Sequence, residues 1–213
     1  MKIINFWGDL TDISAEKEAL VHAGGTHHAR SEVGEGFCVF NDIAVAASVA
    51  MNEFNIERIL VIDLDVHQGN GTAHIFQQDN RITTFDMYCD SNYPWHTRHP
   101  ATHDVPLPND VTDDEYIRLL TEWLPRLALH KPQLIFFQAG VDALAEDSLG
   151  KLSLSRNALN RRNNLVYSFA LEASVPLVVT MGGGYSKPTM EASVTSHADV
   201  YRTAAYRLRA ASL

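Results

Sequence analysis

Short apolar runs alternate with helical patterns along this chain. Consecutive apolar, β-branched and aromatic residues are typical of strands that are buried on both faces of a parallel sheet. Four such runs are predicted as strands: Arg58–Asp63, Arg81–Phe85, Gln133–Gln138 and Val175–Met181. Three segments between them are predicted as helices: Asn41–Asn52, Asp113–Leu129 and Ser155–Leu171. Strands that alternate with helices predict an α/β fold with a parallel sheet.

Local signals set the expected ends of these elements. Thr112 or Asp113 begins the second helix as its N-cap, and Ser155 begins the third. Pro125 is expected to kink or end the second helix, because proline lacks the backbone N–H. Lys2–Phe6 is a further candidate strand. The segment 88–109, rich in proline and aromatic residues, is predicted as a long irregular loop, and such loops are often functional.

Unusual polar residues follow directly after three of the predicted strands. Asp63-x-Asp65-x-His67 follows the first strand, Asp142 follows QLIFFQ, and Gly182-Gly183-Gly184-Tyr185 follows VPLVVTM. Ligands of parallel α/β sheets bind at the carboxyl ends of the strands. These residues are therefore expected to converge on one rim of the sheet.

The spacing of two of these residues indicates a metal site. In an extended segment, residues two apart point the same way, so Asp65 and His67 can share one metal ion. Asp142 supplies a third ligand from another strand end. Two carboxylates, one imidazole and an open position describe a catalytic site for Zn2+ or Fe2+. The alternative is that the acids cap the helix that follows.

Tandem histidines and a glycine run add candidate catalytic groups. His27-His28 follows paired glycines, and a neutral imidazole held in one tautomer is suited to acid–base chemistry on water. Asp63 and Asn70 are candidates for holding these imidazoles. Tyr185 ends the glycine run, where its hydroxyl can donate to a developing oxyanion. A phosphate-binding loop is the less favoured alternative, because no GK[ST] follows the glycines.

Composition narrows the class of protein. The 213 residues predict one domain, and 46% hydrophobic with 20% charged residues is ordinary for a soluble globular protein. The net charge of −9 is a poor match for nucleic acid or an anionic membrane, and it suits a cationic substrate better. Cys38 and Cys89 are expected to be reduced thiols of a cytoplasmic protein. No apolar stretch is long enough for a membrane span.

The remaining histidines are given plainer interpretations. His96, His99 and His103 have a spacing that suggests a second metal, but we interpret them as part of a polar loop. Four further histidines are expected to be structural or surface residues: His22, His74, His130 and His197.

Four motifs resemble a known family. They are GGTHHARSEVGEGFCVFNDIAVAA, ILVIDLDVHQGNGTAHIF, AGVDALAEDSLGKLSLS and GGGYS, and they resemble the zinc-dependent histone deacetylases. The likeness is greatest to the class IV-like branch and its bacterial relatives. It is strongest over residues 19–192 of a single catalytic domain that would fill 1–213. The resemblance implies the three-layer arginase/deacetylase α/β fold, with a parallel central sheet, and hydrolysis of an acetylated amine.

The resemblance also implies roles for individual residues. Asp65, His67 and Asp142 would be the zinc ligands. His27 and His28 would be the tandem histidines, with His28 favoured as the general base. Asp63 would orient His27, and Asn70 would orient His28, as in family members that carry Asn rather than Asp there.

Other implied roles concern the substrate. Tyr185 would polarise the acetyl carbonyl and stabilise the oxyanion. Phe37 and Tyr93 would line a tunnel for the acetylated side chain, and Gly36 and Gly183 would shape its walls.

Two departures from the family pattern modify these expectations. Family domains run to roughly 300 residues, near the upper limit for one core, so the early position of His27 predicts a domain that is truncated at its N-terminus. Such a chain would be a fragment, a gene with a misplaced start or a trimmed paralogue. Asp86 and Tyr88 stand where the family usually has Ser and His. That position lies near a structural monovalent-cation site in relatives, so a cation is expected beside Asp86.

The favoured function is a zinc amidohydrolase that removes acetyl groups from lysine side chains of proteins or peptides. One alternative is a deacetylase of acetylated polyamines or other small amides, and another is an inactive paralogue that acts as a binding protein. A two-metal, arginase-like hydrolase is disfavoured because such sites need more bridging carboxylates. An oligomer that covers an exposed sheet edge is also expected.

Overall fold

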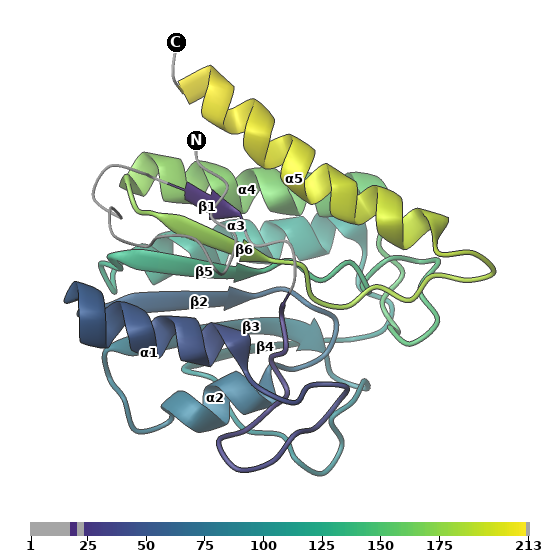
Figure 1. Ribbon diagram of the computed structural model, residues 1–213. Coiled ribbons are helices and arrows are strands. Elements are labelled where there is room, and N and C mark those ends of the chain that lie inside the picture. The colour runs from purple at the N-terminus through teal and green to yellow at the C-terminus, as the bar shows by residue number, and fades with distance from the viewer. Residues whose placement is uncertain (1–17, 21–23, 212–213) are drawn as a thin grey trace.

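A six-stranded parallel sheet forms the centre of the fold (Figure 1). The computed structural model describes residues 18–20 and 24–211. The strands, in chain order, are β1 (Glu18–Leu20), β2 (Ile59–Asp63), β3 (Ile82–Cys89), β4 (His103–Leu107), β5 (Leu134–Gln138) and β6 (Leu177–Thr180). Their order in the sheet is β1-β6-β5-β2-β3-β4. The predicted α/β fold with a parallel sheet is confirmed.

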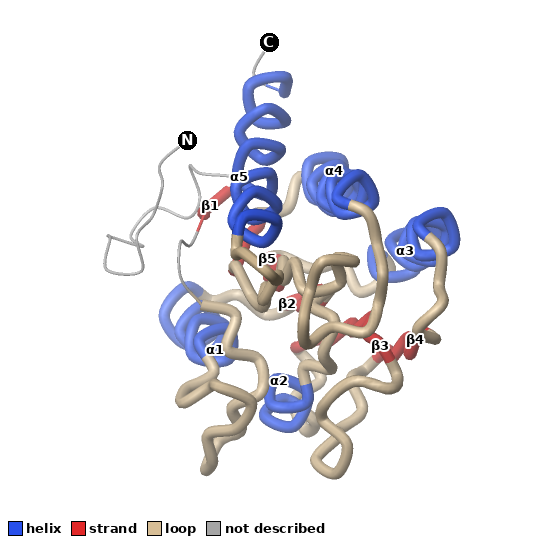
Figure 2. Tube along the Cα trace, turned by 90° about the vertical axis from the view of Figure 1, so that its right-hand side faces the viewer, coloured by secondary structure: helices blue, strands red, loops and turns tan. Residues whose placement is uncertain are grey.

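Helices cover both faces of this sheet and complete three layers (Figure 2). They are α1 (Asp42–Phe54), α2 (Asn70–Phe76), α3 (Asp113–Ala128), α4 (Arg156–Ala173) and α5 (Glu191–Ala211). α1 and α2 lie on one face, and α3, α4 and α5 lie on the other (Figures 1 and 2).

Strand β2 shows why the central runs are continuously apolar. Leu60 and Ile62 belong to the core shared with α3, α4 and α5, whereas Ile59 and Val61 belong to the core shared with α1. Successive side chains of a strand point to opposite faces, so a strand between two helical layers needs an apolar residue at every position. The uninterrupted run in the sequence is therefore the signature of a strand buried on both sides.

The helix starts follow the expected capping chemistry. The side chain of Thr112 accepts a hydrogen bond from the Glu115 backbone N–H, and that of Ser155 accepts one from Ala158. Three acidic residues in the first turn of α3 complement the partial positive charge of the helix N-terminus. Of the two effects expected of Pro125, ending the helix is wrong, since α3 continues to Ala128, and the kink stays a prediction.

The prediction of an irregular segment over 88–109 is wrong in part. Strand β3 continues to Cys89, and β4 lies inside the segment with Val105 and Leu107 buried. Pro106 obscures this strand in the sequence, because proline cannot donate to a sheet ladder. It is accommodated because β4 is the last strand of the sheet. His103 consequently lies in a strand and not in a loop.

Three more elements were not predicted: β1, α2 and α5. The candidate strand Lys2–Phe6 lies outside the residues that the structure describes.

A buried arginine joins the carboxyl ends of β2 and β5. Arg162 of α4 is 0% exposed, and its five N–H groups make five hydrogen bonds. They reach the carbonyls of Leu64, Ala139 and Gly140 and, twice, the Asn163 side chain, at 2.6–3.3 Å. The three carbonyls belong to the segments that carry the candidate metal ligands. Helix α4 thus fixes the rim of the sheet on which the site is built.

Replacing Arg162 by Met is expected to lower the free energy of unfolding by about 3 kcal/mol. Three buried carbonyls would lose their donors, at about 1–3 kcal/mol each, and relief of the arginine's own desolvation offsets part of that loss. Urea unfolding measures the change. Arg161→Met is the matched control: Arg161 is exposed and pairs with Asp114 on the surface, so its loss should cost about 0.5 kcal/mol or less. Equal stability of the two variants would contradict the role given to Arg162.

Candidate metal and catalytic site

Three predicted ligands meet at the carboxyl ends of β2 and β5. His67 Nδ1 lies 3.1 Å from Asp65 Oδ1 and 3.1 Å from Asp142 Oδ2. All three residues are buried, and their ligand atoms lie within 4.8 Å of one another. The Val66 backbone N–H donates to Asp142 Oδ1 at 2.9 Å, which ties the two strand ends together. The structure therefore brings these residues from two separate segments to one point.

The charges of this cluster suit a cation. Burial and the neighbouring Asp65 raise the pKa of Asp142 to about 7. Burial opposes the charged form of His67, but hydrogen bonds with Asp142 and Asp65 raise its pKa to about 10. Without a metal ion, protons on His67 and Asp142 therefore lie between the ligand atoms of the cluster. Two carboxylates and an imidazole form a donor set that Zn2+ or Fe2+ accepts, so these residues fit the expected metal.

The tandem histidines lie beside this cluster with different partners. His27 Nδ1 is 2.6 Å from Asp63 Oδ2, and His28 Nδ1 is 2.8 Å from Asn70 Oδ1. Burial opposes a charge on His27, but Asp63 and Asp65 raise its pKa to about 9. For His28, burial and the charge of His27 lower the pKa to about 3. At neutral pH His27 is therefore the cation of the pair and His28 is the neutral imidazole.

Two glycines allow the backbone to approach these groups. Gly36 has a φ of +54° and packs on the His28 imidazole, so a Cβ there would overlap the ring. Gly183 packs on the Asp142 carboxylate in the same way, and its N–H donates to Asp65 Oδ2 at 2.8 Å. Both positions were predicted to shape the walls of the site, and both lie against site residues. Their role in substrate binding stays a prediction.

Three aromatic side chains lie around the predicted catalytic groups. The Tyr93 ring stands edge-on to His28, with centroids 5.0 Å apart, and 6.5 Å from the His67 ring. The Phe37 ring lies 6.2 Å from that of Tyr185, and Phe37 is 88% exposed. Burial and the charge of Asp65 raise the pKa of Tyr185, so its hydroxyl remains a hydrogen-bond donor. A tunnel between Phe37 and Tyr93 stays a prediction.

Asp86, which stands where the family usually has Ser, is buried next to Asp63, the partner of His27. Asp86 Oδ2 accepts a hydrogen bond from the Gly69 N–H at 2.6 Å. Asp86 Oδ1 is buried and has no hydrogen-bond partner among the described residues. Burial and the neighbouring Asp63 and Asp104 raise the pKa of Asp86. A carboxylate oxygen is therefore left available for a further ligand.

The second metal site considered for the loop histidines is not formed. His103 Nε2 lies 2.9 Å from His130 Nε2, and the His99 ring packs on His74 with centroids 5.2 Å apart. Within residues 18–20 and 24–211, the cluster around His67 is the only ligand group of three or more. Cys38 and Cys89 are buried free thiols, as expected.

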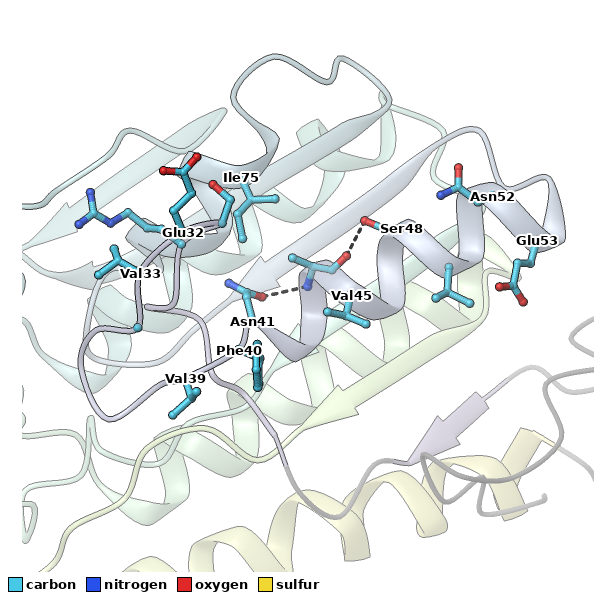
Figure 3. A pocket seen from close by; sticks show the side chains of 15 residues that line it. Glu32, Val33, Val39, Phe40, Asn41, Val45, Ser48, Asn52, Glu53 and Ile75 are labelled. Carbon is cyan, nitrogen blue, oxygen red and sulfur yellow. Dashed lines mark hydrogen bonds between the residues drawn. The ribbon is translucent and has the colours of Figure 1, made fainter.

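A separate hollow of about 520 Å³ lies along the outer side of α1 (Figure 3). Val39, Phe40 and Val45 line it together with Glu32 and Glu53. It contains none of the predicted site residues, so it is distinct from the metal cluster.

Sequence reasoning did not single out two residues that support the site. Arg162 holds the backbone ahead of Asp65 and Asp142, and Glu35 binds the amide of Asn70. In the sequence nothing distinguishes Arg162 from the exposed arginines of the same helix, so its burial is not predictable. Glu35 lies between two glycines of a loop, and its partners are far away along the chain.

The affinity of the chain for zinc is expected to rise with pH between about 5 and 8. Protons on Asp142, with a pKa of about 7, and on His67, with a pKa of about 10, occupy the ligand cluster in this range, and zinc must displace them. Competition with a chromophoric chelator at several pH values measures this dependence. Asp65→Asn should bind zinc weakly at every pH, and Asp110→Asn, on the exposed surface, is the control. An affinity that is independent of pH would contradict the assignment.

The chain is similar in sequence to known proteins. A family model described as the histone deacetylase domain matches residues 5–201. An uncharacterized protein of Picosynechococcus sp. is 45% identical over 166 residues, which cover 78% of this chain and 55% of the relative. Histone deacetylase 2 of Arabidopsis thaliana is 39% identical over 167 residues, which cover 77% of this chain and 43% of the relative. The chain thus spans about half the length of the curated relatives it matches.

Similarity to a solved structure supports the fold. The crystal structure of an acetylpolyamine aminohydrolase from Burkholderia pseudomallei superposes with a TM-score of 0.76 at 20% identity, over 90% of this chain and 57% of that chain. No helix within the described residues is both long and apolar enough to cross a membrane.

Proposed function

This chain belongs to the histone deacetylase domain family, and we propose that it is a metal-dependent amidohydrolase that removes acetyl groups from amines. One observation carries the proposal: a buried cluster of two carboxylates and an imidazole lies beside a neutral histidine, with the His28 and His67 rings 6.0 Å apart. A hydrolase of unactivated amides needs an electrophilic centre and a nearby base, and this arrangement supplies places for both.

Zinc is the proposed metal, with Fe2+ as the alternative, and Asp65, His67 and Asp142 would hold it. When bound, the ion supplies Lewis acidity, which lowers the pKa of water and polarises an amide carbonyl. The chain's own contribution is to keep the ligands apart from bulk water and to fix their positions. The hydrogen bond from Val66 N–H to Asp142 and that from Gly183 N–H to Asp65 perform the second task.

The histidines and the tyrosine would move protons and stabilise charge. His28, neutral and bonded to Asn70 through Nδ1, would accept the proton of the attacking water at Nε2 and deliver it to the leaving amine. His27, charged beside Asp63, would stabilise negative charge that develops nearby. The Tyr185 hydroxyl would donate a hydrogen bond to the oxyanion formed from the acetyl carbonyl.

The proposed substrate is an acetylated lysine side chain of a protein or peptide. Tyr93 beside His28 and Phe37 beside Tyr185 offer two aromatic surfaces for an aliphatic stem. The net charge of −9 favours a cationic product. Acetylated polyamines share this chemistry and are the alternative substrate. A cytoplasmic location and an oligomer that covers a sheet edge both stay predictions.

A monovalent cation beside Asp86 is a further part of the proposal. The buried Oδ1 of Asp86 has no partner in the described part of the chain, and this supports a ligand role. Such a cation would offset the charges of Asp63 and Asp86, which lie next to each other in β2 and β3.

Tyr185→Phe is expected to retain zinc and to lose at least about 100-fold in kcat, as is typical when an oxyanion donor is removed. Acetate release from an acetyl-lysine peptide and the zinc content of the same preparation measure both effects. Tyr206→Phe, on the exposed side of α5, is the matched control. Near wild-type turnover in Tyr185→Phe would remove the role given to the hydroxyl.

His28→Ala is expected to be inactive while it keeps its zinc, because it removes the base and leaves every ligand in place. Activity and zinc content are measured as before, with the exposed His96→Ala as the control. Loss of zinc in His28→Ala would show that this histidine is a ligand and that the proposed roles are wrong.

A further inference from the structure

The carboxylate of Glu35 is the meeting point of four side chains around the site. Its Oε1 accepts hydrogen bonds from Asn70 Nδ2 at 3.1 Å, from the Tyr93 hydroxyl at 2.6 Å and from the Thr97 hydroxyl. Its Oε2 lies 3.3 Å from Arg30 Nη2. Although partial burial opposes the charge, the bonds from Thr97, Tyr93 and Asn70 lower the pKa of Glu35, so it is ionised at neutral pH.

The backbone around Glu35 holds this carboxylate in place. The Glu35 N–H donates to the Cys38 carbonyl at 2.9 Å, and the Cys38 N–H donates back to the Glu35 carbonyl at 2.8 Å. Gly36, inside this turn, has a positive φ and lies directly against His28. Glu35 is therefore held next to Gly36, the residue that packs on the imidazole proposed as the base.

These contacts decide which way the Asn70 amide faces. Its Nδ2 donates both to the Glu35 carboxylate and to the Thr97 carbonyl, at 3.1 and 2.9 Å. Both partners are acceptors only, so the NH2 group must face them and Oδ1 must face His28. Asn70 Oδ1 can only accept, so His28 Nδ1 must carry the hydrogen of the 2.8 Å bond between them. The lone pair of His28 is consequently on Nε2.

We infer that Glu35 is a positioning residue, which sets the tautomer and orientation of His28 through Asn70. His27 has its carboxylate, Asp63, in direct contact, whereas His28 has a neutral amide with the Glu35 carboxylate behind it. The carboxylate that supports His28 is thus one hydrogen bond further from its imidazole than Asp63 is from that of His27. The inference rests on the proposed function, because it takes His28 as the base.

Glu35 also holds one aromatic surface of the site. The Tyr93 hydroxyl donates to Glu35, and this bond keeps the Tyr93 ring edge-on to His28. One carboxylate therefore fixes both the base and the side chain that covers it.

The arrangement predicts a specific interaction between two substitutions. In Asn70→Asp a carboxylate oxygen replaces the Nδ2 atom that now donates to Glu35 Oε1 at 3.1 Å, so two carboxylates would face each other at that distance. Like charges at that distance repel, so Asn70→Asp alone should impair the enzyme. In a Glu35→Gln background the same substitution meets an amide donor. The double variant Glu35→Gln/Asn70→Asp should therefore be more active than Asn70→Asp alone.

The test uses the full chain in two forms. In the zinc-free chain, long-range 15N–1H NMR spectra of the histidine rings report the tautomer of His28. Wild type and the surface control Glu32→Ala should show Nδ1–H, and Glu35→Ala should show a mixture of tautomers. In the zinc-loaded chain, Glu35→Ala should lose about 10–100-fold in kcat on an acetyl-lysine peptide, with a smaller change in KM. Glu35→Gln should lose less and provides a variant with the same shape.

The two readouts separate this inference from the proposed function. An unchanged His28 tautomer in Glu35→Ala and Glu35→Gln, or a double variant no better than Asn70→Asp, would overturn the role of Glu35 in an active enzyme. A changed His28 tautomer in Glu35→Ala, together with a wild-type chain that binds zinc but shows no deacetylation, would support the role of Glu35 and overturn the proposed function.

Discussion

The close packing of Asp65, His67 and Asp142 is the constraint on which the rest of the site depends. Carboxylates buried this close to each other are costly without a cation, and in the metal-free chain protons take that place. The cost is tolerated because the surrounding backbone offers donors at fixed positions. The N–H groups of Val66 and Gly183 each bind one carboxylate. A site that is unfavourable without positive charge suits the metal cation proposed for it.

The parallel sheet provides these positions. Strands β2, β5 and β6 lie side by side and end at the same rim, so the polar residues that follow them meet there. Arg162 then joins the first two ends from the helical layer behind. Beside the cluster, each of the two histidines binds one polar side chain through Nδ1, His27 to Asp63 and His28 to Asn70, but the two imidazoles differ in charge. Asp63 contacts His27 and keeps it charged, whereas burial and the charge of His27 leave His28 neutral.

Much of this architecture is predictable from the sequence, because it depends on local rules. Continuous apolar runs identify the central strands. The Asp-x-Asp-x-His motif identifies candidate ligands, but residues 65–67 form a bend after β2 and not the extended segment that the spacing argument assumed. Features that depend on distant partners are not predictable in this way. Strand β4 contains Pro106 and becomes a strand only at the edge of a sheet. The role of Glu35 depends on its hydrogen bond with Tyr93, which is 58 residues away along the chain.

The central claim is that this chain, with its metal, hydrolyses an acetylated amine. Acetate release from an N-acetyl-lysine peptide by the purified chain, measured alongside its metal content during removal and return of zinc, tests it most directly. The account predicts acetate release in proportion to bound zinc, lost with a chelator and restored when zinc is added. Full zinc occupancy with no acetate released from either an acetyl-lysine peptide or an acetylated polyamine would contradict it.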